Sequence, residues 1–148
     1  MREIKFRGKR LDNGEWVYGF YVKYEHMGVI KYLIITDWAQ VYSNSYYVIP
    51  ETVGQFTGLL DKNGKDIYEG DIVAHNGILQ KNKLLEIRFI DGAFCLYLNG
   101  IPDMARDNNA VTIRDAMFEA QNFRFGVKLI LEVIGNIYEN PELLEVSK

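Results

Sequence analysis

Apolar and polar positions alternate along the first third of the chain, which is the pattern of half-buried β-strands. In the first such segment Ile4 and Phe6 fall on one face and charged side chains on the other. The turn-forming Asn13-Gly14 step separates it from a second alternating segment. The next apolar run is β-branched with little polar interruption, which favours a buried strand, and Pro50 stops the run after it. We predict strands over residues 3–7, 16–22, 29–36 and 46–49.

A hairpin loop is indicated by the Asn63-Gly64 step. A two-residue loop would set Lys62 opposite Lys65, whereas a three-residue loop with a left-handed Gly64 sets Asp61 opposite Lys65. Because like charges directly opposite each other destabilise a strand pair, we predict the three-residue loop.

A second turn is indicated at residues 69–71, ahead of a strand over residues 72–74. We predict a positive φ at Gly70 and turn backbone N–H groups that donate to the Asp71 carboxylate. Glu69 and Asp71 are also a carboxylate pair of the kind that does acid–base work or holds a hard cation. Two carboxylates on one turn are too few for a calcium loop, so the structural interpretation is preferred.

Residues 84–98 carry the strongest local pattern of the chain, because Asp91-Gly92 is a type I′ turn signal. Counting outward from this turn pairs Ile90 with Ala93, Phe89 with Phe94, Ile87 with Leu96 and Leu85 with Leu98. The last three pairs are apolar and share one face, so turn chemistry and pattern agree on one register. The other face carries Glu86, Arg88, Cys95 and Tyr97.

One short helix is predicted near residues 112–122, after a polar loop over residues 99–109. Thr112 and Asp115 have the spacing of a capping box. The inward-facing helix positions are Ile113, Ala116, Met117 and Ala120. Residues 127–138 then predict a long strand bent at Gly135, and the acidic tail after Pro141 is expected to end in a helical turn or to fray.

Seven or more short strands and one helix define a mainly-β chain. Turn signals recur at hairpin spacing, and no strand–helix–strand alternation indicates a parallel sheet. We expect a small barrel or rolled sheet, since this closure leaves few open edges.

Composition narrows the class of protein further. The 148 residues are the size of one domain, and 48% apolar with 25% charged residues is ordinary for a globular protein. No apolar run approaches the roughly 18 residues of a membrane-spanning helix, and no signal peptide is evident. The one cysteine, Cys95, fits a reducing compartment, so we expect a cytoplasmic protein without membrane partners.

The candidate catalytic and metal-ligating residues are few. His26 and His75 have no Cys or His at ligand spacing, so we interpret them as exposed loop histidines and predict no metal. Cys95 has Arg88 as its predicted cross-strand partner but no assignable base, which favours a packing cysteine over a nucleophile. The common nucleotide-binding and esterase motifs are missing, and we predict no cofactor.

Charge is distributed unevenly, although the net charge of −3 does not favour a general nucleic-acid coat. Residues 1–10 carry a net charge of +4 and residues 132–148 a net charge of −3. The candidate contact residues at the basic end are Arg2, Lys5, Arg7, Lys9 and Arg10. They indicate a phosphate-binding edge, an end that joins a neighbouring subunit, or only the solvated face of an edge strand.

An aromatic cluster gives a second candidate surface. Its members are Trp38, Tyr42, Tyr46 and Tyr47. Such a cluster forms a stacking platform for single-stranded nucleic acid, part of a core, or an oligomer interface.

Three segments of the chain resemble the YopX family, small proteins encoded mainly by phages and prophages of low-GC Gram-positive bacteria. They are residues 2–7 (REIKFR), 56–73 (FTGLLDKNGKDIYEGDIV) and 132–144 (EVIGNIYENPELL). Their order and spacing match as well, so the resemblance covers nearly the whole chain.

The resemblance implies a single domain built around an SH3-type barrel of about residues 56–138. Residues 1–55 would supply strands packed against the barrel, and residues 139–148 an acidic tail. It also implies oligomers, but no reaction and no catalytic residues. The structural motif residues are turn formers and their partners: Gly58, Gly64, Gly70, Asp71 and Gly135.

We therefore expect a non-enzymatic accessory protein of a phage or prophage that acts by binding, as a homo-oligomer. The alternative is a nucleic-acid-binding small-barrel module that uses the basic edge and aromatic faces. A third hypothesis, an uncharacterised enzyme, requires a pocket in which Cys95 or a histidine meets carboxylates. The partners to test are a second copy of the chain, nucleic acid, and a phage or host protein.

Overall fold

The computed structural model describes residues 3–76, 84–98, 110–119 and 129–145, and the chain divides into two compact units. The first unit covers residues 1–58 and the second residues 59–148. The first contains β1 (Phe6–Lys9), β2 (Trp16–His26), β3 (Val29–Ile35), the 3-10 helix η1 (Trp38–Gln40), β4 (Ser45–Tyr47), the 3-10 helix η2 (Pro50–Thr52) and most of β5 (Gly54–Leu60). The second contains β6 (Asp66–Tyr68), β7 (Asp71–His75), β8 (Leu85–Ile90), β9 (Ala93–Tyr97), β10 (Ala110–Thr112), α1 (Ile113–Glu119), β11 (Leu131–Asn136) and α2 (Glu142–Glu145).

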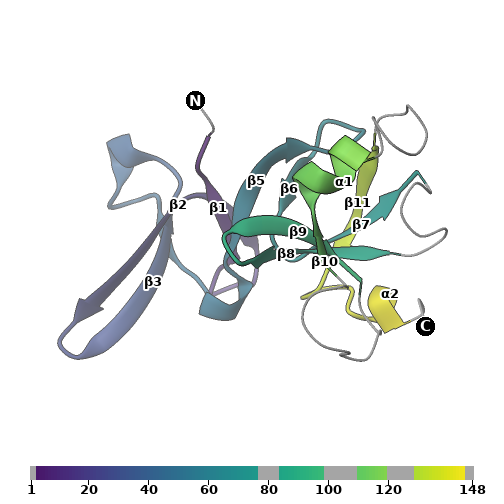
Figure 1. Cartoon of the computed structure of the whole chain (residues 1–148). Helices are drawn as coiled ribbons and strands as arrows, with labels where there is room; N and C mark the ends of the chain where they lie inside the picture. The colour runs from purple at the N-terminus through teal and green to yellow at the C-terminus, as the bar shows by residue number, and fades with distance from the viewer. Residues whose placement is uncertain (1–2, 77–83, 99–109, 120–128, 146–148) are drawn as a thin grey trace. The chain divides into compact units, whose positions relative to one another are not determined.

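The strands of the first unit lie in the order β4-β3-β2-β1-β5, and each neighbouring pair is antiparallel. β2 is longer than predicted: it pairs with β1 as far as Gly19 and then with β3 from Phe20 to His26. β2 and β3 therefore form the long hairpin visible in Figure 1. The prediction that β3 is buried throughout is wrong for its first half, since Val29 and Ile30 are exposed near the hairpin tip.

One face of this sheet forms the core of the first unit. Ile34 is fully buried, and the rings of Phe6 and Tyr21 lie 5.4 Å apart. Gly8 allows close packing here, because a Cβ at this position would lie 3.1 Å from Val48 Cβ and 3.2 Å from Ile34 Cδ1. Since side chains alternate across a strand, the neighbours of Phe6 and Gly8 on β1 lie on the opposite face.

The second unit contains a sheet in the order β10-β9-β8-β7-β11, with antiparallel pairing throughout the described strands. The predicted hairpin register is confirmed from Glu86↔Tyr97 to Ile90↔Ala93. Asp91 and Gly92 both have positive φ, at 49° and 84°, as a type I′ turn requires.

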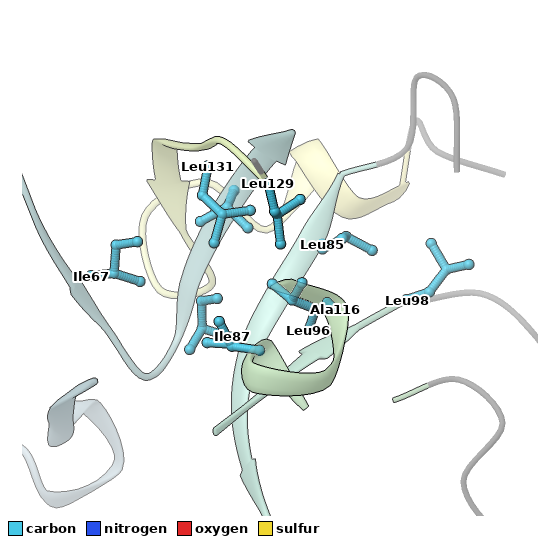
Figure 2. Packing of buried hydrophobic residues seen from close by; sticks show 10 residues of the cluster. Ile67, Leu85, Ile87, Leu96, Leu98, Ala116, Leu129 and Leu131 are labelled. Atoms are coloured by element: carbon cyan, nitrogen blue, oxygen red, sulfur yellow. The ribbon is translucent and has the colours of Figure 1, made fainter. Parts of the chain in front are cut away.

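The apolar cluster of this unit contains buried side chains from its strands and from α1, and Figure 2 shows them gathered together. Ile113 and Ala116 of α1 are buried in it, as predicted, and Met117 packs against it; Ala120 lies outside the described residues. The Asp115 N–H donates to Thr112 Oγ1 over 3.0 Å, which confirms half of the capping box. The other half differs, because Asp115 Oδ2 accepts from the Thr112 hydroxyl instead of a backbone N–H.

The three-residue loop between β5 and β6 is confirmed. The Asp61 N–H donates to the Lys65 carbonyl over 2.8 Å, and Gly64 has φ 80°. Asp61 Oδ1 accepts from the N–H groups of Asn63 and Lys65, while Asp61 Oδ2 accepts from the Val133 N–H of β11 over 3.1 Å. This one carboxylate therefore joins the loop to the sheet.

The turn before β7 also matches its prediction. Gly70 has φ 81°, and Asp71, which is 1% exposed, accepts the Tyr68 N–H over 2.8 Å. The predicted bend in the last strand is present as a register shift between Val133 and Gly135. The mainly-β class is thus confirmed, whereas the SH3-type closure and the packing of the N-terminal strands on a barrel stay predictions.

Candidate binding surface

The basic residues at the start of the chain are held by a central strand. β1 pairs with β2 on one side and with β5 on the other, so the interpretation of this segment as an edge strand is wrong. Lys5, Arg7 and Lys9 share one face because they are two residues apart along an extended chain.

Aromatic rings lie against each of these cations. Lys9 is paired with Trp16 across the β1–β2 ladder, and its Nζ lies 5.5 Å from the ring centroid. The Arg7 guanidinium lies 4.7 Å from the same ring, and Lys5 Nζ lies 4.5 Å from the ring of Phe56. Cation–π contacts of this kind hold long basic side chains along the sheet surface.

The same face continues along β2 to a first exposed ring pair, Phe20 and Trp38. Their centroids are 5.6 Å apart, and the side chains are 47% and 56% exposed. Trp38 begins η1, which is capped by Asp37 through a 2.8 Å bond from the Ala39 N–H to the carboxylate. A large part of both rings therefore faces solvent from a defined backbone position.

A second exposed ring pair lies further along the hairpin. The hydroxyl oxygens of Tyr24 and Tyr47 are 3.3 Å apart, and Lys31 Nζ lies 5.2 Å from the Tyr47 ring centroid. The hydrogen bond with Tyr24 lowers the pKa of Tyr47, and the Lys31 charge acts in the same direction. The same hydrogen bond raises the pKa of Tyr24.

We call these residues together the cation–aromatic face. Its members are Lys5, Arg7, Lys9, Trp16, Tyr18, Phe20, Tyr24, Lys31, Trp38 and Tyr47. Within strands β1 to β4 this face carries no carboxylate, because Glu25 lies at an alternate position of β2 and points to the other side. Just before β1, Lys5 Nζ donates to the Glu3 carboxylate over 3.2 Å. The arrangement can bind anions and flat apolar groups side by side.

The structure distributes the five predicted contact residues over different environments. Arg2 lies outside the described residues, and Arg7 is only 5% exposed. Arg10 lies off the cation–aromatic face: it binds Asp12 with two hydrogen bonds, of 2.9 and 2.5 Å, and its guanidinium covers Tyr46 at 4.5 Å. Lys5 and Lys9 are the two of the five that lie on the face and are partly exposed.

The predicted aromatic platform is likewise divided. Trp38 and Tyr47 belong to the cation–aromatic face, Tyr46 lies beneath Arg10, and Tyr42 is fully exposed. A shallow cleft of about 280 Å³ lies beside Tyr46 and Tyr47 and is lined by Leu11, Asp12, Ser45, Tyr46 and Tyr47. Sequence reasoning does not assign Phe20, Tyr24 or Lys31 to the surface, although rings at every second position of β2 are a signal for it.

Of the candidate chemical residues, Cys95 and His75 belong to the second unit, whereas His26 ends β2 on the same face as Phe20 and Tyr24. Cys95 is buried in β9 opposite Arg88, as predicted, but the Arg88 guanidinium binds Glu86 over 2.7 Å and covers Tyr97. His26 and His75 end strands β2 and β7, so the prediction that they are loop residues is wrong. Among the residues that the structure describes, no group of three His, Cys, Asp or Glu side chains is placed to hold a metal ion.

The fold and surface define a small, mainly-β protein with a cationic and aromatic sheet face. The chain belongs to the YopX family, since the family model described as YopX protein matches residues 5–145. It is similar over 97% of its length, at 25% identity, to protein EF1440 from Enterococcus faecalis, whose crystal structure is covered over 99% with a TM-score of 0.46. A search of curated proteins found no match. No helix in the described parts of the chain is long and apolar enough to cross a membrane.

Proposed function

We propose that this chain is a non-catalytic protein that binds nucleic acid through the cation–aromatic face. The observation that carries the proposal is the repeated contact of a cation with an aromatic ring across β1–β4, on a side of the sheet free of carboxylates in those strands. Cations supply attraction to phosphates, and rings supply surface for bases or sugars.

The net charge of −3 does not oppose this proposal, because the charges are segregated. Four cations lie on the face: Lys5, Arg7, Lys9 and Lys31. Because Arg7 is 5% exposed and Lys5 is paired with Glu3, we expect the attraction to phosphates to come chiefly from Lys9 and Lys31. At 0.1 M salt the field of a fixed charge is screened beyond about 10 Å. The charges near the binding surface therefore affect the attraction of a polyanion more than the net charge of the whole chain does.

The test is a binding titration of labelled DNA and RNA, each single- and double-stranded, from about 50 to 200 mM salt. We expect binding that weakens as salt rises, and Lys31→Glu should weaken it and flatten the salt dependence by roughly one phosphate contact. Lys23→Glu is the matched control: Lys23 sits in the same hairpin and covers Tyr32 at 5.8 Å, but on the opposite face. Absence of all binding at about 50 mM salt would refute the proposal.

The biological setting we propose is accessory work for a phage or prophage, in the bacterial cytoplasm, without a catalytic step. This proposal is supported by membership of the YopX family alone. The neighbouring genes test it: genes for replication, recombination or packaging are expected beside this one, whereas a purely metabolic neighbourhood would contradict it.

Self-association is a second candidate activity, which the β2–β3 hairpin supports. The hairpin tip exposes Met27 at 90%, together with Val29 and Ile30. Among the described residues, positions 23–26 of β2 and 29–32 of β3 form ladder pairs with each other, and from Lys31 to the tip no backbone hydrogen bond to a third strand is present. A two-stranded ribbon of this kind is marginal by itself, and its open edges favour pairing with another chain.

Light scattering at micromolar concentration tests this second candidate. A homo-oligomer that Met27→Lys dissociates, while Leu60→Lys at a 60% exposed position of the second unit leaves it intact, would support assembly through the tip. A monomer at all concentrations would exclude it, and a phage or host protein would then be the partner to seek.

A further inference from the structure

We infer that the ligand of the cation–aromatic face is a single-stranded nucleic acid whose bases stack on the two exposed ring pairs, Phe20–Trp38 and Tyr24–Tyr47. This inference rests on the proposed function and adds the strandedness of the ligand and the residues that read it. The binding mode is stacking on flat side chains, without recognition of base edges.

The exposure of the rings is the first argument. Phe20, Trp38 and Tyr47 are each between 45% and 56% exposed, although the structure buries other large apolar side chains completely. A duplex hides its base faces inside the stack and presents phosphates and groove edges. Among nucleic acids, therefore, unpaired bases rather than a duplex can cover half-exposed rings on a sheet surface, which is how single strands bind small β-barrels.

The spacing of the two ring pairs is the second argument. Phe20 and Tyr24 are four residues apart on β2, which is about 13 Å along an extended strand. Consecutive stacked bases are about 3.4 Å apart, so the two pairs would hold separate bases of an extended strand. Between them, Val22 and Leu33 are paired across the ladder and provide an apolar floor.

The position of the cations is the third argument. Lys31 lies over Tyr47 at one ring pair, and Lys9 lies at Trp16 towards the other end of the face. A strand that follows β2 would therefore meet a cation near each end. A protein partner would use the rings equally well, but Lys9 and Lys31 lie on strands β1 and β3, in which no carboxylate shares their face, and this matches a polyanion better.

The decisive experiment measures fluorescence anisotropy with oligo-dT, oligo-U and a duplex of equal length. We expect both single strands to bind more tightly than the duplex. Trp38→Ala should weaken single-strand binding about 5- to 150-fold, the range for losing one stacked base, and Trp38→Phe should restore most of it. The matched control is Tyr42→Ala, which removes a fully exposed ring four residues away and should leave affinity unchanged.

Tryptophan emission gives an independent readout, because the chain has two tryptophans, Trp16 and Trp38. Oligo-dT should quench the emission of the Trp16→Phe variant, in which Trp38 is the remaining tryptophan. Far-ultraviolet circular dichroism of each variant checks that it is folded.

The outcomes separate the two proposals. If single strands and duplex bind equally and Trp38→Ala has no effect, the stacking inference is wrong while the proposed nucleic-acid binding stands. If no nucleic acid binds at about 50 mM salt, both proposals fail. If Trp38→Ala and Tyr42→Ala weaken binding equally, the ring pairs are not the site and the inference is overturned.

Discussion

Asp61 is the residue whose substitution most sharply tests how the second unit is held together. Its side chain is 7% exposed and accepts three backbone N–H groups, two within its own loop and one from β11. Asp61→Asn keeps the size of the side chain but turns one of the two oxygens into an NH2 donor. Whichever way the amide is oriented, at least one backbone N–H then faces a donor and loses its acceptor.

The expected loss of stability follows from the number of backbone N–H groups left without an acceptor. Leaving one buried N–H unsatisfied costs about 1–3 kcal/mol, and the bonds that remain lose the strengthening that a charged acceptor gives. For a chain of this size each kcal/mol lowers the melting temperature by about 2–4 °C, so we expect a fall of about 3–10 °C. Asp91→Asn is the control, since Asn-Gly suits the type I′ turn as well as Asp-Gly does.

Acid should remove the same stabilisation. Burial raises the pKa of Asp61, but the N–H groups of Lys65, Val133 and Asn63 outweigh it and hold the pKa below its usual range. The folded pKa is therefore below the unfolded value of about 3.9, so the stabilisation is fully present above that pH and is lost as pH falls through the folded pKa. The stability difference between wild type and Asp61→Asn should shrink below about pH 4.

The assay is thermal unfolding followed by far-ultraviolet circular dichroism, because both tryptophans lie in the first unit and would not report directly on the second. Hydrogen exchange of the Val133 amide gives the local readout and should be faster in Asp61→Asn. If Asp61→Asn melts within 1 °C of Asp91→Asn at pH 7, and Val133 exchange is unchanged, the bonding argument is wrong.

Three other substitutions test the remaining structural claims. Gly70→Val should lower the melting temperature by several degrees, because Gly70 has φ 81° and a Cβ there would lie 3.0 Å from the Tyr138 ring; unchanged melting would contradict it. Gly19→Ala should destabilise the first unit, because the new Cβ would overlap the Ile35 backbone oxygen. Urea unfolding followed by tryptophan emission measures this loss of stability. Tyr24→Phe should raise the pKa of Tyr47 towards its ordinary value, measured from the Tyr47 ring resonances by NMR in an alkaline titration; an unchanged Tyr47 titration would show that Tyr24 does not lower this pKa.

The elements predicted correctly from sequence are those in which local signals are decisive. The β8–β9 hairpin has a type I′ turn at Asp91-Gly92 and an apolar pattern that both require the same register. In the Asp61–Lys65 loop the Asn63-Gly64 step marks the turn, and the charges decide between two closures; the predicted one is present. Both depend on residues within about a dozen positions of each other, so they require no tertiary information.

The candidate surface is less accessible to sequence reasoning, because its members are joined across strands. Alternation places Arg7 on a face, but it does not say that Trp16 covers that face and leaves Arg7 5% exposed. Pairing of Trp38 with Phe20 depends on the course of the chain after β3. The exposure of the first half of β3 escapes prediction because an apolar run has the same pattern whether it enters a core or a projecting hairpin.

Two of the three segments that resemble the family lie wholly or mainly in the second unit, and its fold explains them. The Lys62 N–H donates to the Leu131 carbonyl, Lys62 Nζ binds Glu132 over 2.7 Å, and the Ile137 N–H donates to the Gly70 carbonyl. Together with the bond from Val133 to Asp61, these contacts join residues 56–73 to residues 132–144.

A motif whose residues hold two distant segments together can be recognised in a sequence without carrying any information about a ligand. The cation–aromatic face takes Lys5 and Arg7 from the segment 2–7, but its other members come from residues 9–47, outside those motifs. Family membership therefore predicts the fold of this chain, while the ligand we propose is inferred from residues of the first unit. It follows that a YopX protein with the same turn motif but without rings matching Phe20 and Trp38 would fold alike and bind differently.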